Sequence, residues 1–280
     1  MTSLAGRTII ITGGSRGIGR AIALRCAADG ANIVIAAKSD QPHPKLPGTI
    51  HSVAEEVTNA GGQALAVKVD VRDEESVQQM VQQAVEQFGG VDALVNNAGA
   101  LRLTNVENTP IKRFDLLHQV NTRAVLLCSQ AALPYLKKSG HGHILNLSPP
   151  LNLDPKWFKG YSPYTVTKYG MTMLTTGMSE EFRKDSIAVN SLWPRTAIAT
   201  AAVEFAAGGP EVLAISRKPE IMADAAYAIL SSDSEFTGNH CLDEQILKDR
   251  GQTEFDHYAA VPGNKKFFTD LYVDDSPGFA

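Results

Sequence analysis

The stretch TGGSRGIG, residues 12–19, decides how the fold of this chain is read, because it lies between a strand-like run and a helical one. The run RTIIIT precedes it, and GIGRAIALRCAADG begins within it. A glycine-rich turn in that position is typical of a dinucleotide site, in which the pyrophosphate meets the helix N-terminus. An ordinary glycine-rich turn is the alternative. The predicted cofactor contacts in this turn are Gly13, Ser15, Arg16, Gly17, Ile18 and Gly19.

Short apolar, β-branched runs alternate with helical stretches along the chain. The expected strands are 7–12, 32–37, 64–71, 91–99, 142–148 and 187–193. The expected helices are 17–30, 52–62, 74–90, 111–138 and 165–183. Parallel strands joined by helical crossovers explain this alternation. We therefore predict an α/β protein with a single-domain Rossmann fold, a doubly wound parallel sheet with helices on both faces.

Two segments fall outside the alternation. Residues 39–50 contain three prolines and are expected to form a loop inside the second crossover. Residues 251–280 mix Pro, Gly, Asp and aromatic side chains without a period. We expect one domain over 1–250 and an irregular C-terminal tail over 251–280.

The bulk composition excludes several classes of protein. The net charge of −4 provides no basic surface for nucleic acid, and no apolar run reaches the roughly 18 residues that span a bilayer. The three cysteines show no paired spacing, so we expect a reducing compartment, the cytoplasm. His141 and His143 have no acidic or cysteine partner nearby in the sequence, and we expect no metal site.

The end of the second strand selects between nicotinamide cofactors. NAD sites place an acidic residue there to bind the ribose 2′-hydroxyl. This chain has Ala36 and Ala37 at that point, followed by Lys38, and Arg16 lies in the glycine turn. Two cations without a carboxylate suit a 2′-phosphate, which favours NADP. NAD remains possible, because a shift of the loop could bring Asp40 to the ribose.

The stretch YSPYTVTKYG, residues 161–170, contains a candidate acid/base group. Tyr164 and Lys168 are four residues apart and share one face of a helix, whereas Tyr161 has no lysine at that spacing. A phenol must lower its pKa of about 10 by about 3 units to work near neutrality, and a neighbouring ammonium favours the phenolate. The pair predicts proton transfer beside a bound nicotinamide.

Together, TGGSRGIG, NNAG at 96–99 and the Tyr164–Lys168 pair resemble the classical short-chain dehydrogenase/reductase family over about residues 6–245. The segments QPHPKLPGTI and LSPPLNLDP look most like its hydroxysteroid dehydrogenase-like branch, type two. Longer members of that branch append a sterol-carrier-like domain, which we do not expect in this chain.

The resemblance implies roles for further residues. Asp70 would meet the adenine amino group, and Asn121 would hold a water for proton relay. Tyr164 would be the acid/base, and Lys168 would hold the nicotinamide ribose and lower the pKa of the tyrosine. The remaining implied cofactor contacts are Val71, Asn97, Ala98, Gly99, Pro194, Thr196 and Ile198. The resemblance also implies a homodimer or homotetramer formed through the long helices.

Two positions depart from the family pattern. Arg195 replaces the glycine that follows the proline, so that turn must adopt another φ or direct a new charge toward the cofactor. Pro149 stands where the family has its catalytic serine, and Ser148 lies one residue earlier. Because adjacent strand residues face opposite sides, Ser148 reaches the site only if the chain bends there. Asn152 is the possible substitute.

The leading functional hypothesis is an NADP-dependent oxidoreductase that interconverts an alcohol and a carbonyl on a largely apolar small-molecule substrate, such as a lipid, steroid or terpenoid. A cofactor-binding regulatory protein with little turnover is one alternative, because the serine is displaced. An epimerase or dehydratase that retains its nicotinamide is the other.

Overall fold

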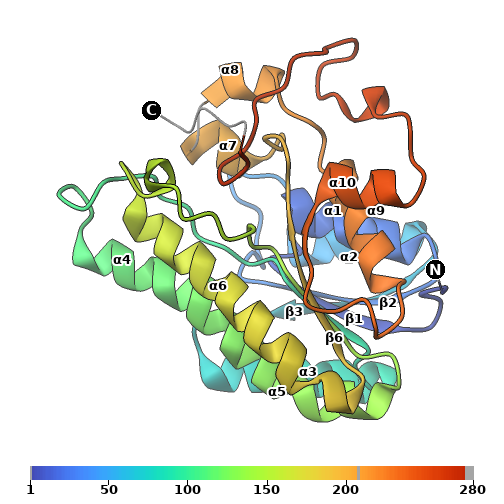
Figure 1. Ribbon diagram of the computed structural model, residues 1–280. Coiled ribbons are helices and arrows are strands. Elements are labelled where there is room, and N and C mark those ends of the chain that lie inside the picture. The colour runs from blue at the N-terminus through green and yellow to red at the C-terminus, as the bar shows by residue number, and fades with distance from the viewer. Residues whose placement is uncertain (1, 207–208, 275–280) are drawn as a thin grey trace.

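The computed structural model describes residues 2–206 and 209–274, and it contains one seven-stranded sheet in which every pair of neighbouring strands is parallel (Figure 1). The strand order is β3-β2-β1-β4-β5-β6-β7. The strands are β1 (Thr8–Thr12), β2 (Asn32–Ala37), β3 (Gln63–Lys68), β4 (Ala93–Asn96), β5 (His143–Asn146), β6 (Ala188–Trp193) and β7 (His240–Leu242). The predicted Rossmann fold is confirmed.

Helices cover both faces of the sheet (Figure 1). One face carries α1 (Gly17–Ala27), α2 (Ile50–Asn59), α9 (Glu220–Leu230) and α10 (Asp243–Asp249). The other carries α3 (Glu74–Phe88), α4 (Ile111–His118), α5 (Ala124–Ser139) and α6 (Ser162–Glu181). The strands are apolar on both sides, so each layer of helices closes its own hydrophobic core.

Two short helices, α7 (Ala201–Ala206) and α8 (Gly209–Ala214), follow β6 at the edge of the sheet where the strands end. The part of the chain that the structure describes also contains short 3₁₀ turns, which are η2 (Pro155–Trp157), η3 (Arg183–Asp185) and η4 (Asp256–Tyr258). Among the described residues, no helix combines the length and apolar character needed to cross a membrane.

Local sequence signals place the boundaries of several elements. Thr49 and Ser52 form a capping box that starts α2 directly after the proline-rich loop, which is a loop as predicted up to Thr49. The helix expected over 111–138 is interrupted by a π-helical turn, η1 (Gln119–Arg123), between α4 and α5. Such a turn inserts one extra residue and re-aims the side chains around it. The inserted segment contains Asn121.

The sequence analysis named no element after residue 193, and the structure adds β7, α9 and α10 there. The strand β7 has three half-buried residues, which is too short to show a two-residue period. It becomes a strand because β6 is already in place and offers an edge, with Leu192 paired to Cys241.

The end of the described chain, Phe267–Val273, is here called the C-terminal strap. Its backbone is held against the segment after β6, because Ala197 N donates to Phe268 O at 2.8 Å. The ring of Tyr272 is 1% exposed and contacts Trp157, Tyr169 and Trp193. The strap is therefore packed into the domain, although it forms no long helix or strand.

Candidate active site

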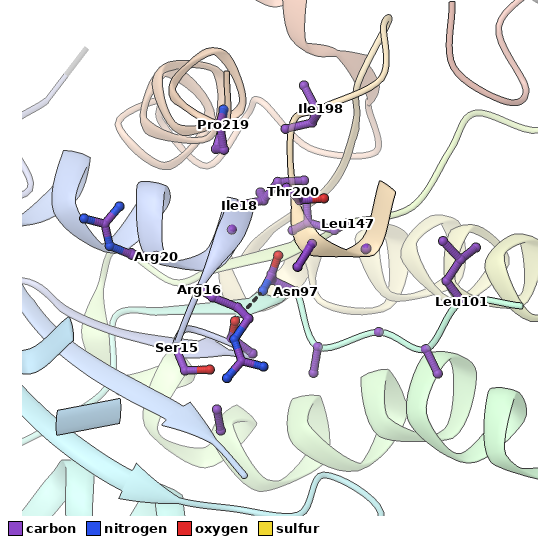
Figure 2. A pocket seen from close by; sticks show the side chains of 18 of the residues that line it. Ser15, Arg16, Ile18, Arg20, Asn97, Leu101, Leu147, Ile198, Thr200 and Pro219 are labelled. Atoms are coloured by element: carbon purple, nitrogen blue, oxygen red, sulfur yellow. Dashed lines mark hydrogen bonds between the residues drawn. The ribbon is translucent and has the colours of Figure 1, made fainter. Parts of the chain in front are cut away.

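A cleft of about 1280 Å³ opens at the carboxyl edge of the sheet. It lies where the strand order turns back on itself, between β1 and β4, which is the usual ligand position in doubly wound sheets. Figure 2 shows part of its wall, from Arg20 on α1 to Leu101 after β4. The cleft is large enough for a dinucleotide together with a second small molecule, since single drug-sized ligands occupy roughly 300–1,000 Å³.

The glycine turn is locked to the end of β4. Asn97 Nδ2 donates to Thr12 O at 2.9 Å and to Gly13 O at 3.1 Å (Figure 2). A Cβ on Gly19 would lie 2.4 Å from that same Nδ2 and 2.6 Å from Gly13 O. Gly13 itself has a φ of +68°, which a side chain rarely adopts. The turn thus leaves its backbone bare and close to the start of α1, as a bound pyrophosphate requires.

Most of the predicted cofactor contacts line this cleft. They are Gly13, Ser15, Arg16, Gly17, Ile18, Lys38, Asp70, Val71, Asn97, Ala98, Gly99, Lys168, Pro194 and Ile198. Gly19 and Thr196 do not line it. Gly19 instead permits close packing of α1 on Asn97, and Thr196 forms a backbone bridge to Thr269 of the C-terminal strap.

Arg16 anchors the proline-rich loop to the glycine turn. Its guanidinium donates to Pro47 O at 2.9 Å, to Gly48 O at 3.1 Å and to Ser39 Oγ at 2.8 Å. Burial lowers the pKa of Arg16 from its usual value. Gly48 is required at that contact, because a Cβ there would lie 2.3 Å from Ser15 O. The loop therefore forms part of the cleft wall beside the predicted ribose position.

Asp70 and its cationic neighbours form the adjoining wall. Arg72 donates to both Asp70 oxygens, with the shortest contact from Nη2 at 2.6 Å, and Lys38 Nζ lies 3.2 Å from Oδ2. The hydrogen bonds from Arg72 hold the pKa of Asp70 well below its usual range. Arg72 lines the cleft, and the sequence analysis did not single it out. Asp40 does not line it: it is paired with His51 and Lys68.

Tyr164 and Lys168 line the opposite end of the cleft, together with Asn121. Tyr161 does not: its ring is 3% exposed within an aromatic cluster. Asn121 is fully buried in η1, where its Oδ1 accepts from Ala100 N at 2.8 Å and its Nδ2 donates to Thr167 Oγ1 at 2.9 Å. These bonds tie η1 to the segment after β4 and to α6.

The pKa of Tyr164 is shifted in the direction opposite to the one expected. Burial and the nearby Asp270 raise the pKa of Tyr164 above its usual value, whereas Lys168 was expected to lower it. Lys168 Nζ instead donates to Leu147 O at 2.5 Å and lies 5.1 Å from the centre of the Trp193 ring. Burial lowers the pKa of Lys168 to about 7.

The structure does not bring Ser148 or Asn152 into this group. Ser148 is fully buried, and its hydroxyl accepts a hydrogen bond from Thr172 Oγ1 at 3.0 Å behind the cleft wall. Leu147, the neighbouring residue, lines the cleft instead, because adjacent strand residues face opposite sides. The amide of Asn152 donates to Asp274 at the surface. The carbonyl-side donor expected from Ser148 is therefore absent from the cleft.

Arg195, one of the two departures from the family pattern, is accommodated without a change to a positive φ. Its φ is not positive, so the turn after β6 follows an ordinary backbone path. Its backbone N–H donates to Asp243 Oδ1 at 2.8 Å, and its carbonyl accepts from Asp270 N at 3.0 Å. The turn is thus held by carboxylate and backbone contacts rather than by a glycine.

Asp270 is a second cleft residue, besides Arg72, that sequence reasoning missed. It lies in the C-terminal strap and lines the cleft near Tyr164 and Lys168. Burial raises the pKa of its carboxyl to about 7. Nothing in the local sequence marks it, because its neighbour in space, Lys168, is about a hundred residues earlier in the chain.

Comparison with known proteins agrees with this geometry. A family model described as short chain dehydrogenase matches residues 7–206. The chain belongs to the short-chain dehydrogenase family. It is also 58% identical over 274 residues to hydroxysteroid dehydrogenase-like protein 2 of Bos taurus, which confirms the resemblance to that branch. The match covers 98% of this chain and 65% of the length of that relative.

Two solved structures of the family extend the comparison. A short-chain dehydrogenase of Mycobacterium thermoresistibile is 50% identical with a TM-score of 0.91, and the match covers 99% of each chain. A metagenomic short-chain oxidoreductase in complex with NADP is 26% identical with a TM-score of 0.71, covering 86% of this chain and 98% of that one.

Proposed function

We propose that this short-chain dehydrogenase is an NADP-dependent oxidoreductase that interconverts an alcohol and a carbonyl on a largely apolar substrate. The observation that carries the proposal is that Tyr164 and Lys168 line the same cleft as the glycine turn. The glycine turn would hold the pyrophosphate of a dinucleotide, and Tyr164 and Lys168 would supply the proton transfer that its nicotinamide chemistry requires.

The chain supplies proton transfer and orientation. The bound nicotinamide supplies or accepts the hydride. In reduction, the Tyr164 hydroxyl gives its proton to the oxygen of the substrate carbonyl. The Lys168 ammonium favours the phenolate that remains, by Coulomb attraction in a cleft of low polarity. Asn121 fixes η1 against α6 through Thr167 and so keeps Tyr164 in position.

The end of the cleft that is lined by Lys38, Asp70 and Arg72 is here called the adenosine end, and its cations support NADP over NAD. Arg16, Lys38 and Arg72 all line the cleft, and Asp70 is the carboxylate shared by two of them. Asp40, which would have favoured NAD, is engaged by His51 and Lys68. A surplus of cations suits the ribose 2′-phosphate, for which guanidinium and ammonium groups are the usual partners. The metagenomic relative in complex with NADP is consistent with this choice.

The end of the cleft that is lined by Tyr164 and Lys168 is here called the catalytic end, and its walls favour an apolar substrate. Its wall near Tyr164 is largely hydrocarbon and aromatic, formed by Leu101, Leu103, Leu116, Trp193 and Leu271. Such a wall binds a ligand by burying its apolar surface, so it can accept substrates of several shapes. The name of the mammalian relative points in the same direction, toward hydroxylated steroids or similar lipids.

A homodimer or homotetramer remains part of the proposal. Large apolar side chains are exposed on the long helices: Leu126 on α5, and Val166 and Met173 on α6. These helices lie side by side on one face of the molecule (Figure 1). Exposed apolar groups on adjacent helices suit an interface between copies.

The test compares Tyr164→Phe with Tyr161→Phe, a tyrosine on the same segment that does not line the cleft. Ketone reduction is followed by loss of NADPH absorbance. We expect Tyr164→Phe to lose about 10²- to 10⁴-fold in kcat/KM, the usual contribution of a general acid, while Tyr161→Phe retains activity if it folds. Equal rates in Tyr164→Phe and the parent would reject the assigned acid.

The displacement of Ser148 from the cleft favours one second candidate, a cofactor-binding regulatory protein with little turnover. That alternative predicts tight NADPH binding, measured by fluorescence of the bound cofactor, without oxidation or reduction of any member of a broad alcohol and ketone panel. Turnover that depends on Tyr164 would exclude it.

A further inference from the structure

The carboxyl of Asp270 is anchored at one oxygen and open at the other. Leu271 N donates to its Oδ1 at 2.6 Å, and Asp270 N donates to Arg195 O at 3.0 Å. Its Oδ2 accepts no hydrogen bond from any residue of 2–206 or 209–274, and the side chain lines the cleft. The residue thus presents one free carboxyl oxygen to whatever occupies the catalytic end.

The C-terminal strap fixes that position. On one side of Asp270, Thr269 forms a backbone bridge with Thr196. On the other side, Trp193 Nε1 donates to Leu271 O at 2.9 Å. Tyr272 then adopts a φ of +69°, which costs a non-glycine residue about 1 kcal/mol or more, so its packing must offset that strain. Asp270 is therefore held by contacts on both flanks, independently of its own carboxyl.

Tyr272 provides the offsetting contacts and ties the strap to the catalytic helix. Its hydroxyl lies 3.1 Å from Thr165 Oγ1, the residue that follows Tyr164 on α6. Its ring contacts three other aromatic rings. The strap is therefore packed directly against α6, next to Tyr164.

Three ionisable groups face Asp270 or act on it. Tyr164 and Lys168 do so from α6, and Asp243 does so from the start of α10. Arg217 acts on Asp243 and pairs with Glu244. Burial raises the pKa of Asp270, as does Asp243, while the hydrogen bond from Leu271 N and the charge of Lys168 lower it, with a result of about 7. Near neutrality a substantial fraction of Asp270 is therefore in the acid form, which can donate a hydrogen bond.

The cleft lacks the donor that short-chain dehydrogenases usually place opposite the phenol. Ser148 is hydrogen-bonded to Thr172 behind the wall, and Pro149 has no hydroxyl. A carbonyl that is being reduced gathers negative charge on its oxygen, and a second donor besides the tyrosine stabilises that charge. Among the described residues, Asp270 is the carboxyl that lines the cleft and acts on both Tyr164 and Lys168.

We propose that Asp270 is a further catalytic residue, whose carboxyl in its acid form donates a hydrogen bond to the carbonyl oxygen of the substrate in place of the absent serine. This inference rests on the proposed oxidoreductase function. The carbonyl carbon receives a hydride from NADPH, and the oxygen receives the Tyr164 proton, which solvent replaces. The Asp270 proton stays on its carboxyl, so the sum is carbonyl, NADPH and one proton giving alcohol and NADP⁺.

The kinetic test uses Asp270→Asn, Asp270→Ala and the matched control Asp274→Asn, an exposed carboxylate four residues further along the chain. With cyclododecanone and NADPH at pH 6, we expect Asp270→Ala to lose about 10²-fold in kcat, the usual effect of removing one such donor. Asp270→Asn keeps a donor that cannot ionise. It should retain kcat within about tenfold and lack the decline in rate that we expect of the parent as pH rises through about 7.

The control should match the parent at every pH. If Asp270→Ala matches the parent at pH 6 while Tyr164→Phe is inactive, the role of Asp270 is wrong and the proposed function stands. An unchanged pH profile in Asp270→Asn would likewise overturn the role, because a purely structural carboxylate would leave the profile where it is.

A second measurement does not need turnover. In a complex of the protein with NADP⁺ and ¹³C-carbonyl cyclododecanone, the infrared carbonyl band reports hydrogen bonding to the ketone oxygen. We expect a shift to lower frequency in the parent and in Asp274→Asn, and a smaller shift in Asp270→Ala. An equal shift in parent and Asp270→Ala, or no shifted band in the parent, would overturn the inference.

Discussion

The two ends of the cleft treat ionisable groups in opposite ways. At the adenosine end, Lys38 is 63% exposed and pairs with Asp70, and the pKa of Asp70 is held below its usual range by Arg72. At the catalytic end, burial shifts each group toward its neutral form. The pKa of Tyr164 rises, that of Lys168 falls to about 7, and that of Asp270 rises to about 7.

This difference separates binding from chemistry. Groups whose charge is fixed over the whole physiological range can hold a phosphate without changing state. Groups whose pKa lies near the working pH can exchange protons during a reaction. The adenosine end obtains fixed charges from paired ions at the surface. The catalytic end obtains groups of variable charge by burying Lys168 and Asp270, whose pKa values both lie at about 7.

The largest effect on activity should come from removing a charge at the catalytic end. Lys168→Met keeps the length of the side chain and removes its charge, so the phenolate of Tyr164 loses its stabilising cation. We expect kcat/KM for ketone reduction to fall about 10²- to 10⁴-fold. Lys159→Met, at an exposed position before α6, is the control and should be unaffected. Full activity in Lys168→Met would show that the two ends do not differ in the way described.

A smaller effect should come from the fixed charges. Lys38→Ala removes one cation beside the predicted 2′-phosphate, and we expect the ratio of kcat/KM for NADPH to that for NADH to fall about tenfold. Lys45→Ala, an exposed lysine in the proline-rich loop that does not line the cleft, is the matched control. An unchanged ratio in Lys38→Ala would place the selectivity elsewhere, with Arg16 as the next residue to test.

The smallest effect concerns stability in the absence of cofactor. The pKa of Asp70 is lower in the folded state than in the unfolded state, so its ionised form stabilises the fold above pH 4, and this contribution is lost as pH falls below that value. Because the pair is partly open to solvent, we expect Asp70→Asn to cost about 1 kcal/mol at pH 7.

Urea unfolding of Asp70→Asn and parent at pH 7 and pH 3 measures this contribution. The difference between them should shrink at the lower pH. Asp115→Asn, at an exposed position on α4, should show no such dependence. A difference that grows on acidification would mean that the sign of the Asp70 contribution is wrong.

Much of the fold could be predicted because its signals are local. The glycine turn lies between β1 and α1 as expected, and the Tyr164–Lys168 spacing needs only one turn of helix to place both groups in the cleft. The strand β7 was missed because it depends on the edge of β6 rather than on a pattern of its own. The π-helical turn at Asn121 likewise has no sequence period of its own.

The sequence by itself determined the strands up to β6, the glycine turn after β1 and the helical spacing of Tyr164 and Lys168, since each follows from residues within a few positions of one another. Only the tertiary structure decided that Ser148 faces Thr172, that Asp270 enters the cleft, and that burial moves the pKa of Tyr164 upward. These outcomes depend on contacts such as that between Thr165 and Tyr272, which are 107 positions apart. Solvent exclusion and long-range packing exist only once the chain has folded.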